Sequence, residues 1–164
     1  MTAEPLLKLA ARLLTKHRLD AVLIGNAAAA LNGAPVTTMD LDFFFRATPG
    51  SLRKLRLIAE DLHVAVTQPY YPGSMLYRLS KPEDNLQFDF MPRISGVRSF
   101  EGVRARATVV QFGGNDLRVA TLIDVIRSKK AADRPEDRAI MPTLKRTVKE
   151  RQAFYGKKKR RRSA

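Results

Sequence analysis

The segment from Ala21 to Phe45 constrains the fold of this chain more than any other part of the sequence. A short apolar run ends in Gly25-Asn26, and an alanine-rich stretch follows it. A loop then leads to Asp40-Leu41-Asp42, which opens a second apolar run containing three consecutive phenylalanines. This pattern predicts a strand, a tight turn, a short helix, a loop and a second strand.

Asp40 and Asp42 are the first candidates for chemistry. Residues two apart on a strand point to the same face, so these two carboxylates should lie side by side. Adjacent carboxylates repel unless a cation lies between them, and a hard divalent ion such as Mg²⁺ suits such a pair. The alternative is an exposed strand end whose acids face solvent. The three phenylalanines that follow place the pair at the rim of a core and favour the metal site.

The remaining periodicities predict an α/β domain in which helices and strands alternate. Asp89 lies in an apolar strand, where a charge needs a partner, although a buried structural Asp bonded to backbone amides would also fit. Residues 93–106 read as an irregular Arg-rich loop and 113–116 as a hairpin or turn. The expected helices are 4–17, 52–63, one from 119, and a last one from 135 to about 154; the expected strands are 21–24, 40–45, 64–66, 75–79, 86–90 and 107–112.

Length and net charge indicate how many domains the chain forms and what kind of partner it binds. The 164 residues suit a single domain, expected over 1–156, followed by a basic disordered tail at 157–164. The formal net charge is +14, of which the tail supplies six charges, and this excess favours nucleic acid over a membrane as partner. The sequence contains no Cys, no run long enough to span a membrane and no signal-peptide pattern, so a cytoplasmic location is expected.

Gly25-Asn26 followed after thirteen residues by Asp40-x-Asp42 resembles the signature of nucleotidyltransferases of the DNA polymerase beta-like superfamily. More narrowly, residues 24–45 are similar to small prokaryotic nucleotidyltransferases of toxin–antitoxin and abortive-infection systems. The resemblance covers roughly residues 20–145. It departs from the family at Asn26, where Gly or Ser is usual, and this puts phosphate placement in question.

The resemblance implies a nucleotidyltransferase fold, a small mixed β-sheet with flanking helices and a C-terminal helical portion. It further implies site roles by position. Asp40, Asp42 and Asp89 would bind metal and act in catalysis; Gly25 and Asn26 would hold phosphates; and Thr38 would support the acid-bearing loop, unless it is only a turn residue. Segment 126–137 is similar to the family's C-terminal module, in which Lys129 would reach the triphosphate and Asp137 would orient it. Glu136 reverses the charge of the family's Lys at that position.

The implied reaction is a Mg²⁺-dependent (or Mn²⁺-dependent) transfer of a nucleoside monophosphate from an NTP to an acceptor hydroxyl. The basic charge favours RNA as the acceptor, with the 3′ end of tRNA expected by resemblance to toxin nucleotidyltransferases. Two alternatives remain open at this stage. The acceptor could be a partner protein, as in family members that act as antitoxins by adding AMP to it, or the chain could be an inactive nucleic-acid-binding module.

Overall fold

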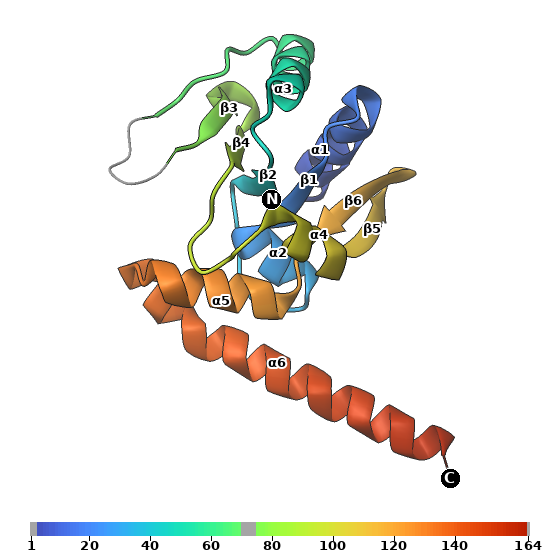
Figure 1. Ribbon diagram of the computed structural model, residues 1–164. Coiled ribbons are helices and arrows are strands. Elements are labelled where there is room, and N and C mark those ends of the chain that lie inside the picture. The colour runs from blue at the N-terminus through green and yellow to red at the C-terminus, as the bar shows by residue number, and fades with distance from the viewer. Residues whose placement is uncertain (1–2, 70–74, 164) are drawn as a thin grey trace.

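The computed structural model describes residues 3–69 and 75–163, and these form one six-stranded sheet with helices around it (Figure 1). The strands lie in the order β3-β4-β2-β1-β6-β5. The elements are α1 (Glu4–His17), β1 (Ala21–Ile24), α2 (Gly25–Leu31), β2 (Leu41–Phe45), α3 (Pro49–Leu62), β3 (Tyr77–Lys81), the 3₁₀ turn η1 (Pro82–Asp84), β4 (Leu86–Met91), α4 (Phe100–Arg106), β5 (Thr108–Phe112), β6 (Asn115–Val119), α5 (Leu122–Ala132) and α6 (Pro135–Arg162).

The sheet is mixed, as predicted. β2 runs parallel to β4 and β1 parallel to β6, while the β1–β2, β3–β4 and β5–β6 pairs are antiparallel. The α/β class and the C-terminal helical portion expected from the sequence are therefore confirmed. Among the described residues, no helix is both long enough and apolar enough to cross a lipid bilayer.

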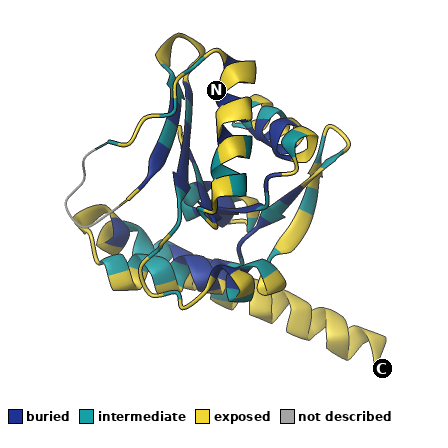
Figure 2. Cartoon of the chain, turned by 45° about the horizontal axis from the view of Figure 1, so that its top comes forward, coloured by how far each residue is buried: buried dark blue, intermediate teal, exposed yellow. Residues whose placement is uncertain are grey.

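One face of β2 and β4 builds an aromatic core. Phe43 and Phe90 stack with ring centroids 4.9 Å apart, and Phe88 meets Phe43 edge to face. All three residues are almost completely buried, and buried residues gather on the strands at the centre of the sheet (Figure 2). Because side chains alternate along a strand, the residues between these phenylalanines point to the other face of the sheet. This alternation places the two central acids, Asp42 and Asp89, opposite the aromatic layer.

Several helix and strand assignments differ from the sequence-based prediction. Residues 93–106, expected as an irregular loop, contain α4, whose N-cap Ser99 accepts a hydrogen bond from the Gly102 amide. Residues 64–66 form no strand; only an isolated bridge joins Thr67 to Arg78. Of the hairpin or turn expected at 113–116, the structure has the hairpin: the chain turns at Gly113-Gly114 and returns at once as β6, a strand between β1 and β5 that was not among the expected strands.

The last helix extends further than predicted, because α6 continues as one helix to Arg162 and does not end near residue 154. Lys and Arg are good helix formers, so local propensity favours continuation even though their like charges repel. From Lys149 onward every described residue is exposed, and the helix leaves the body of the molecule (Figures 1 and 2). Arg151 still reaches the body, donating to the backbone and side-chain oxygens of Asn32 at 3.2 and 2.9 Å.

Candidate active site

Charged side chains form a row across three neighbouring strands. Strand register places Asp42 of β2 beside Asp89 of β4, and Asp89 beside Arg78 of β3. Arg78 grips Asp89 with two nitrogens, Nε to Oδ1 at 2.8 Å and Nη2 to Oδ2 at 2.9 Å. Gln87 Nε2 donates a third hydrogen bond to Asp89 Oδ2 at 3.0 Å. Both oxygens of Asp89 are therefore engaged by protein donors.

Gly25 lets the chain turn from β1 into α2 directly against Asp42. Its φ is +67°, a left-handed conformation that favours glycine. A Cβ at this position would lie 2.8 Å from Asp42 Oδ2, closer than side-chain atoms can approach. The glycine thus serves two purposes at once, the backbone turn and the space for a carboxylate.

Asp40 lies just before β2, in a turn held by Thr38. The Thr38 hydroxyl donates to the Asp40 carbonyl at 2.6 Å and accepts from the Asp40 amide at 3.3 Å. Asp40 is more exposed than Asp42, yet it belongs to the same electrostatic cluster. Burial and the charge of Asp89 raise the pKa of Asp40, and Arg78 partly offsets the rise.

Asp42 is costly to ionise in this position. Burial, followed by the charges of Asp89 and Asp40, raises the pKa of Asp42 to about 6, while Lys129 and Arg134 act in the opposite direction. A carboxylate in this setting is stabilised by an added cation. The geometry of the strand pair therefore concentrates negative charge at one point of the sheet surface.

The donor set fits a divalent cation at Asp40 and Asp42. Within residues 3–69 and 75–163, neither carboxylate has a hydrogen bond or ion pair to a protein donor, so their oxygens can serve as hard ligands for Mg²⁺ or Mn²⁺. Asp89 differs, because Arg78 and Gln87 already hold its oxygens. In keeping with this, no three acidic or histidine side chains of the described residues form a ready-made metal site.

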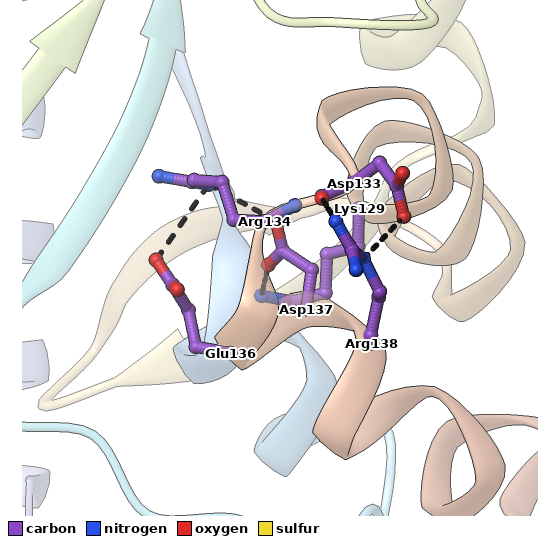
Figure 3. Close-up of polar contacts among 6 residues, drawn as sticks. All are labelled: Lys129, Asp133, Arg134, Glu136, Asp137 and Arg138. Atoms are coloured by element: carbon purple, nitrogen blue, oxygen red, sulfur yellow. Dashed lines mark hydrogen bonds and ion pairs between the residues drawn. The ribbon is translucent and has the colours of Figure 1, made fainter.

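A second polar cluster joins the end of α5 to the start of α6 (Figure 3). Lys129 Nζ donates to Asp137 Oδ1 at 3.1 Å, and Arg134 Nε donates to Asp137 Oδ2 at 3.0 Å. Burial would raise the pKa of Asp137, but the hydrogen bonds and charges of Arg134 and Lys129 outweigh it and lower that pKa. Asp137 also accepts from the Arg134 amide and so caps the first turn of α6.

These groups face one cavity of about 610 Å³ between the sheet and the α5–α6 junction. Both acidic and basic side chains line it. Its lining includes Gly25, Asp42, Arg78, Asp89, Lys129 and Arg134, together with apolar side chains such as Leu76 and Met91. An anionic substrate bound to a cation could be held among these charges, because a nucleoside triphosphate with its metal ion needs both carboxylate and cationic partners.

Four of the predicted site residues line this cavity: Gly25, Asp42, Asp89 and Lys129. Asp40 does not line the cavity, but its charge raises the pKa of Asp42. Asp137 does not line it either, but it accepts a hydrogen bond from Lys129. Thr38 holds the Asp40 turn. Asn26 is not among the lining residues, but its Oδ1 is buried and has no hydrogen-bond partner among the described residues.

Sequence reasoning missed three features around the cavity. Arg78 stands in the sequence as one residue of an expected strand, yet an Arg between buried Tyr77 and Leu79 must reach a polar partner. Arg134 belongs to the 126–137 motif, which assigns it no role. Asp124, almost fully buried, accepts from Arg106 at 2.9 and 3.0 Å and from Arg127 at 3.0 Å, and so ties α4 to α5.

The fold is that of known nucleotidyltransferases. ANT(2″)-Ia, solved in complex with adenylyl-2″-tobramycin, is 15% identical over 96% of this chain and 99% of that chain, with a TM-score of 0.59. The lincosamide antibiotic adenylyltransferase LnuA, solved with lincomycin, is 14% identical over 88% and 97%, with a TM-score of 0.59. A Thermotoga maritima protein described as a nucleotidyltransferase is 18% identical over 89% and 92%, with a TM-score of 0.57.

Sequence comparison assigns the chain to a family. Residues 3–164 match the model described as "Nucleotidyl transferase of unknown function (DUF2204)", and the chain belongs to that family of nucleotidyltransferases. No curated protein matches the sequence. The enzyme class expected from the two Asp motifs is thereby confirmed, whereas a toxin–antitoxin context receives no support from these comparisons.

Proposed function

We propose that this protein transfers a nucleoside monophosphate from an NTP to an acceptor hydroxyl and releases pyrophosphate, in the cytoplasm and with Mg²⁺ or Mn²⁺. The observation that carries the proposal is the Asp42–Asp89 pair in register on β2 and β4, with Lys129 and Arg134 across the same cavity. Such a site works by positioning and charge stabilisation, without a covalent enzyme intermediate.

Each residue has a distinct part in this proposal. Asp40 and Asp42 would hold the cation, which when bound polarises the attacking oxygen and offsets charge on the departing pyrophosphate. Lys129 and Arg134 neutralise the triphosphate, and Asp137 orients both of them. Asp89 supplies the third carboxylate, as a further metal ligand or as acceptor of the hydroxyl proton. The acceptor oxygen attacks the α-phosphorus while the bond from that phosphorus to the pyrophosphate oxygen breaks.

Gly25, Asn26 and Thr38 complete the nucleotide side of the site. Gly25 leaves room for the Asp42 carboxylate at the start of α2, and Thr38 fixes the turn that carries Asp40. Asn26 would hold a phosphate beside Gly25, but its side-chain oxygen is buried and has no partner among the described residues, so the side chain would have to rotate to reach a ligand. Because the NH₂ group of an amide is a hydrogen-bond donor, a rotated Asn26 would donate to a phosphate despite its departure from the family's Gly or Ser.

We propose RNA as the acceptor, with the 3′ end of tRNA and a toxin–antitoxin or abortive-infection setting as its specific form. The support is electrostatic. The formal charge is +14, and the exposed end of α6 carries six consecutive cations. The names of ANT(2″)-Ia and LnuA refer to adenylylation of small antibiotics. A small acceptor would gain little from a cluster of cations on an exposed helix end, so the charge favours a polyanion.

The test uses purified protein, Mg²⁺, each of the four α-³²P-labelled NTPs and total RNA, beside an Asp40→Ala/Asp42→Ala variant. Label on a tRNA-sized band that is absent with the variant is the expected result, and it identifies the nucleotide. Label only on a co-purifying protein would replace the RNA acceptor with a protein, the runner-up. Label on neither, with RNA still bound, would leave an inactive binding module.

A further inference from the structure

We propose that Arg78 is a further positioning residue of this site: in the protein without nucleotide it holds Asp89 by both oxygens and so keeps the third carboxylate out of the cation site. This role rests on the proposed function. It concerns how the three acids are brought together, which membership of the family does not explain.

The ion pair between Arg78 and Asp89 is bidentate and largely buried. The Nε and Nη2 nitrogens of Arg78 meet Oδ1 and Oδ2 at 2.8 and 2.9 Å, the parallel arrangement that makes Arg–carboxylate pairs strong. Only 8% of the Asp89 side chain is exposed. Gln87 adds a bond to Oδ2 at 3.0 Å, so the carboxylate is fixed from two sides.

The position of the pair shows why the grip matters to the site. Asp89 lies in register with Asp42, and both line the cavity with Arg78. The charge of Asp89 raises the pKa of both Asp40 and Asp42, while Arg78 lowers that of Asp40. The guanidinium therefore offsets the third negative charge at the point where a cation would bind. Asp40 and Asp42 are left as the available ligands.

A guanidinium that binds a carboxylate in this geometry binds a phosphate equally well. The triphosphate of an NTP, once in the cavity, offers Arg78 a second partner. Transfer of Arg78 to a phosphate would release Asp89 toward the cation and the acceptor hydroxyl. The third carboxylate would then join the site only when nucleotide is present.

The test is Mn²⁺ binding without nucleotide, measured by calorimetry and by electron paramagnetic resonance of free Mn²⁺. The proteins are wild type, Arg78→Lys, Arg78→Gln, Asp89→Asn and Arg78→Gln/Asp89→Asn, each checked for folding by circular dichroism. Arg78→Lys keeps the charge and loses the two-pronged grip, so it separates holding from simple electrostatics. We expect Mn²⁺ affinity to rise several-fold in Arg78→Lys and at least fivefold in Arg78→Gln.

In the Asp89→Asn background, the released side chain has no charge to offer, so the gain from Arg78→Gln should shrink to about twofold or less. Unchanged or weaker Mn²⁺ binding in a folded Arg78→Lys variant would overturn the proposal. So would a gain from Arg78→Gln that persists in full with Asn at position 89, because that would be a charge effect alone. Failure of wild type to bind Mn²⁺ at all would instead reject the cation site of the proposed function.

Discussion

Gly25, just after β1, and Asp42, on the neighbouring strand β2, lie so close together that a side chain at position 25 would collide with the Asp42 carboxylate. The missing Cβ at Gly25 is what allows the Asp42 carboxylate to lie over the start of α2, with Oδ2 2.8 Å from where that Cβ would be. The burial that results makes Asp42 costly to ionise. Both the backbone turn and the charge of the site thus depend on one hydrogen atom in place of a methyl group.

Replacing Gly25 with Ala should reduce nucleotidyl transfer more than it reduces the stability of the fold. The left-handed φ alone costs about 1–2 kcal/mol for a residue with a Cβ, and the clash with Asp42 adds to it. We expect urea unfolding to show a loss of stability and nucleotidyl transfer to fall at least 100-fold. Gly114→Ala is the matched control, because Gly114 has a φ of +81° and nothing within 4 Å. Equal effects of the two variants on transfer would contradict the role given to Gly25.

Asp42 should make the metal-free protein less stable as pH rises. The pKa of Asp42 is about 6 in the folded protein, compared with 3.8 for a free Asp side chain such as that of the unfolded chain. The folded state therefore binds the proton more tightly than the unfolded state. Stability is then lost between about pH 4 and pH 6, by about 3 kcal/mol when complete. In EDTA, Asp42→Asn should melt several degrees above wild type at pH 7.5, and the two should converge near pH 4.

Added Mn²⁺ should raise the melting temperature of the wild type at pH 7.5 and leave Asp42→Asn nearly unchanged. Asp116→Asn, at an exposed position on β6, is the control for loss of one carboxylate. Parallel melting curves for wild type and Asp42→Asn at every pH would show that Asp42 is ionised without cost.

At the scale of elements, the junction of α5 and α6 depends on a buried ion pair. The side chains of Lys129 and Asp137 are 12% and 1% exposed, whereas that of Arg134 is 63% exposed. Loss of one partner from a buried pair leaves an uncompensated charge. Arg134 can turn to water when Asp137 is removed, but Lys129 cannot do so freely.

Asp137→Ala should therefore destabilise the protein by about 3–5 kcal/mol, and Lys129→Met/Asp137→Ala by less than Asp137→Ala alone. Urea unfolding of the single and double variants measures the difference. Glu4→Ala breaks the exposed pair between Glu4 and Lys8 and should change stability by less than about 0.5 kcal/mol. A double variant that is less stable than Asp137→Ala would mean that the unpaired charge of Lys129 does not destabilise the Asp137→Ala protein.

The elements that local pattern defines were predictable, and those that depend on distant partners were not. The 4–17 helix and the β1-turn-α2-β2 unit follow from periodicity and glycine positions, and they appear as predicted. β6 was not predicted as a strand, and its place between β1 and β5 is decided by tertiary pairing. For the same reason Asp42, Asp89 and Lys129 could be proposed from motifs, whereas Arg78 is defined only by its register opposite Asp89.

At the scale of the whole molecule, the basic end of α6 lies apart from the hydrophobic core. Residues 149–163 are exposed throughout, and the core lies within the sheet and its covering helices. The six cations from Lys157 to Arg162 therefore contribute to the field of the molecule without supporting its core. Binding of a polyanion and folding can be changed independently.

Deletion of residues 157–164 lowers the formal charge from +14 to +8. We expect the melting temperature to change little and RNA affinity at low salt to fall at least tenfold. The slope of log affinity against log salt should become shallower by up to about 4, because each phosphate of a single strand that a cation neutralises adds about 0.7 to it. Filter binding at about 50–300 mM KCl, the range in which such slopes are measurable, tests this. An unchanged slope would mean that RNA binds elsewhere on the protein.

The row formed by Arg78, Asp89 and Asp42 also has a consequence for how faithfully the sheet assembles. Each of the three residues lies between buried apolar neighbours on its own strand, and a slip of one residue would exchange the two faces. A slipped β4 would push the Asp89 carboxylate into the layer that contains Phe43 and Phe45 of β2, and would leave Arg78 opposite an aromatic ring. Misaligned pairings are thus penalised by unpaired charge in an apolar layer, and the residues proposed for chemistry also help to select the correct strand alignment during folding.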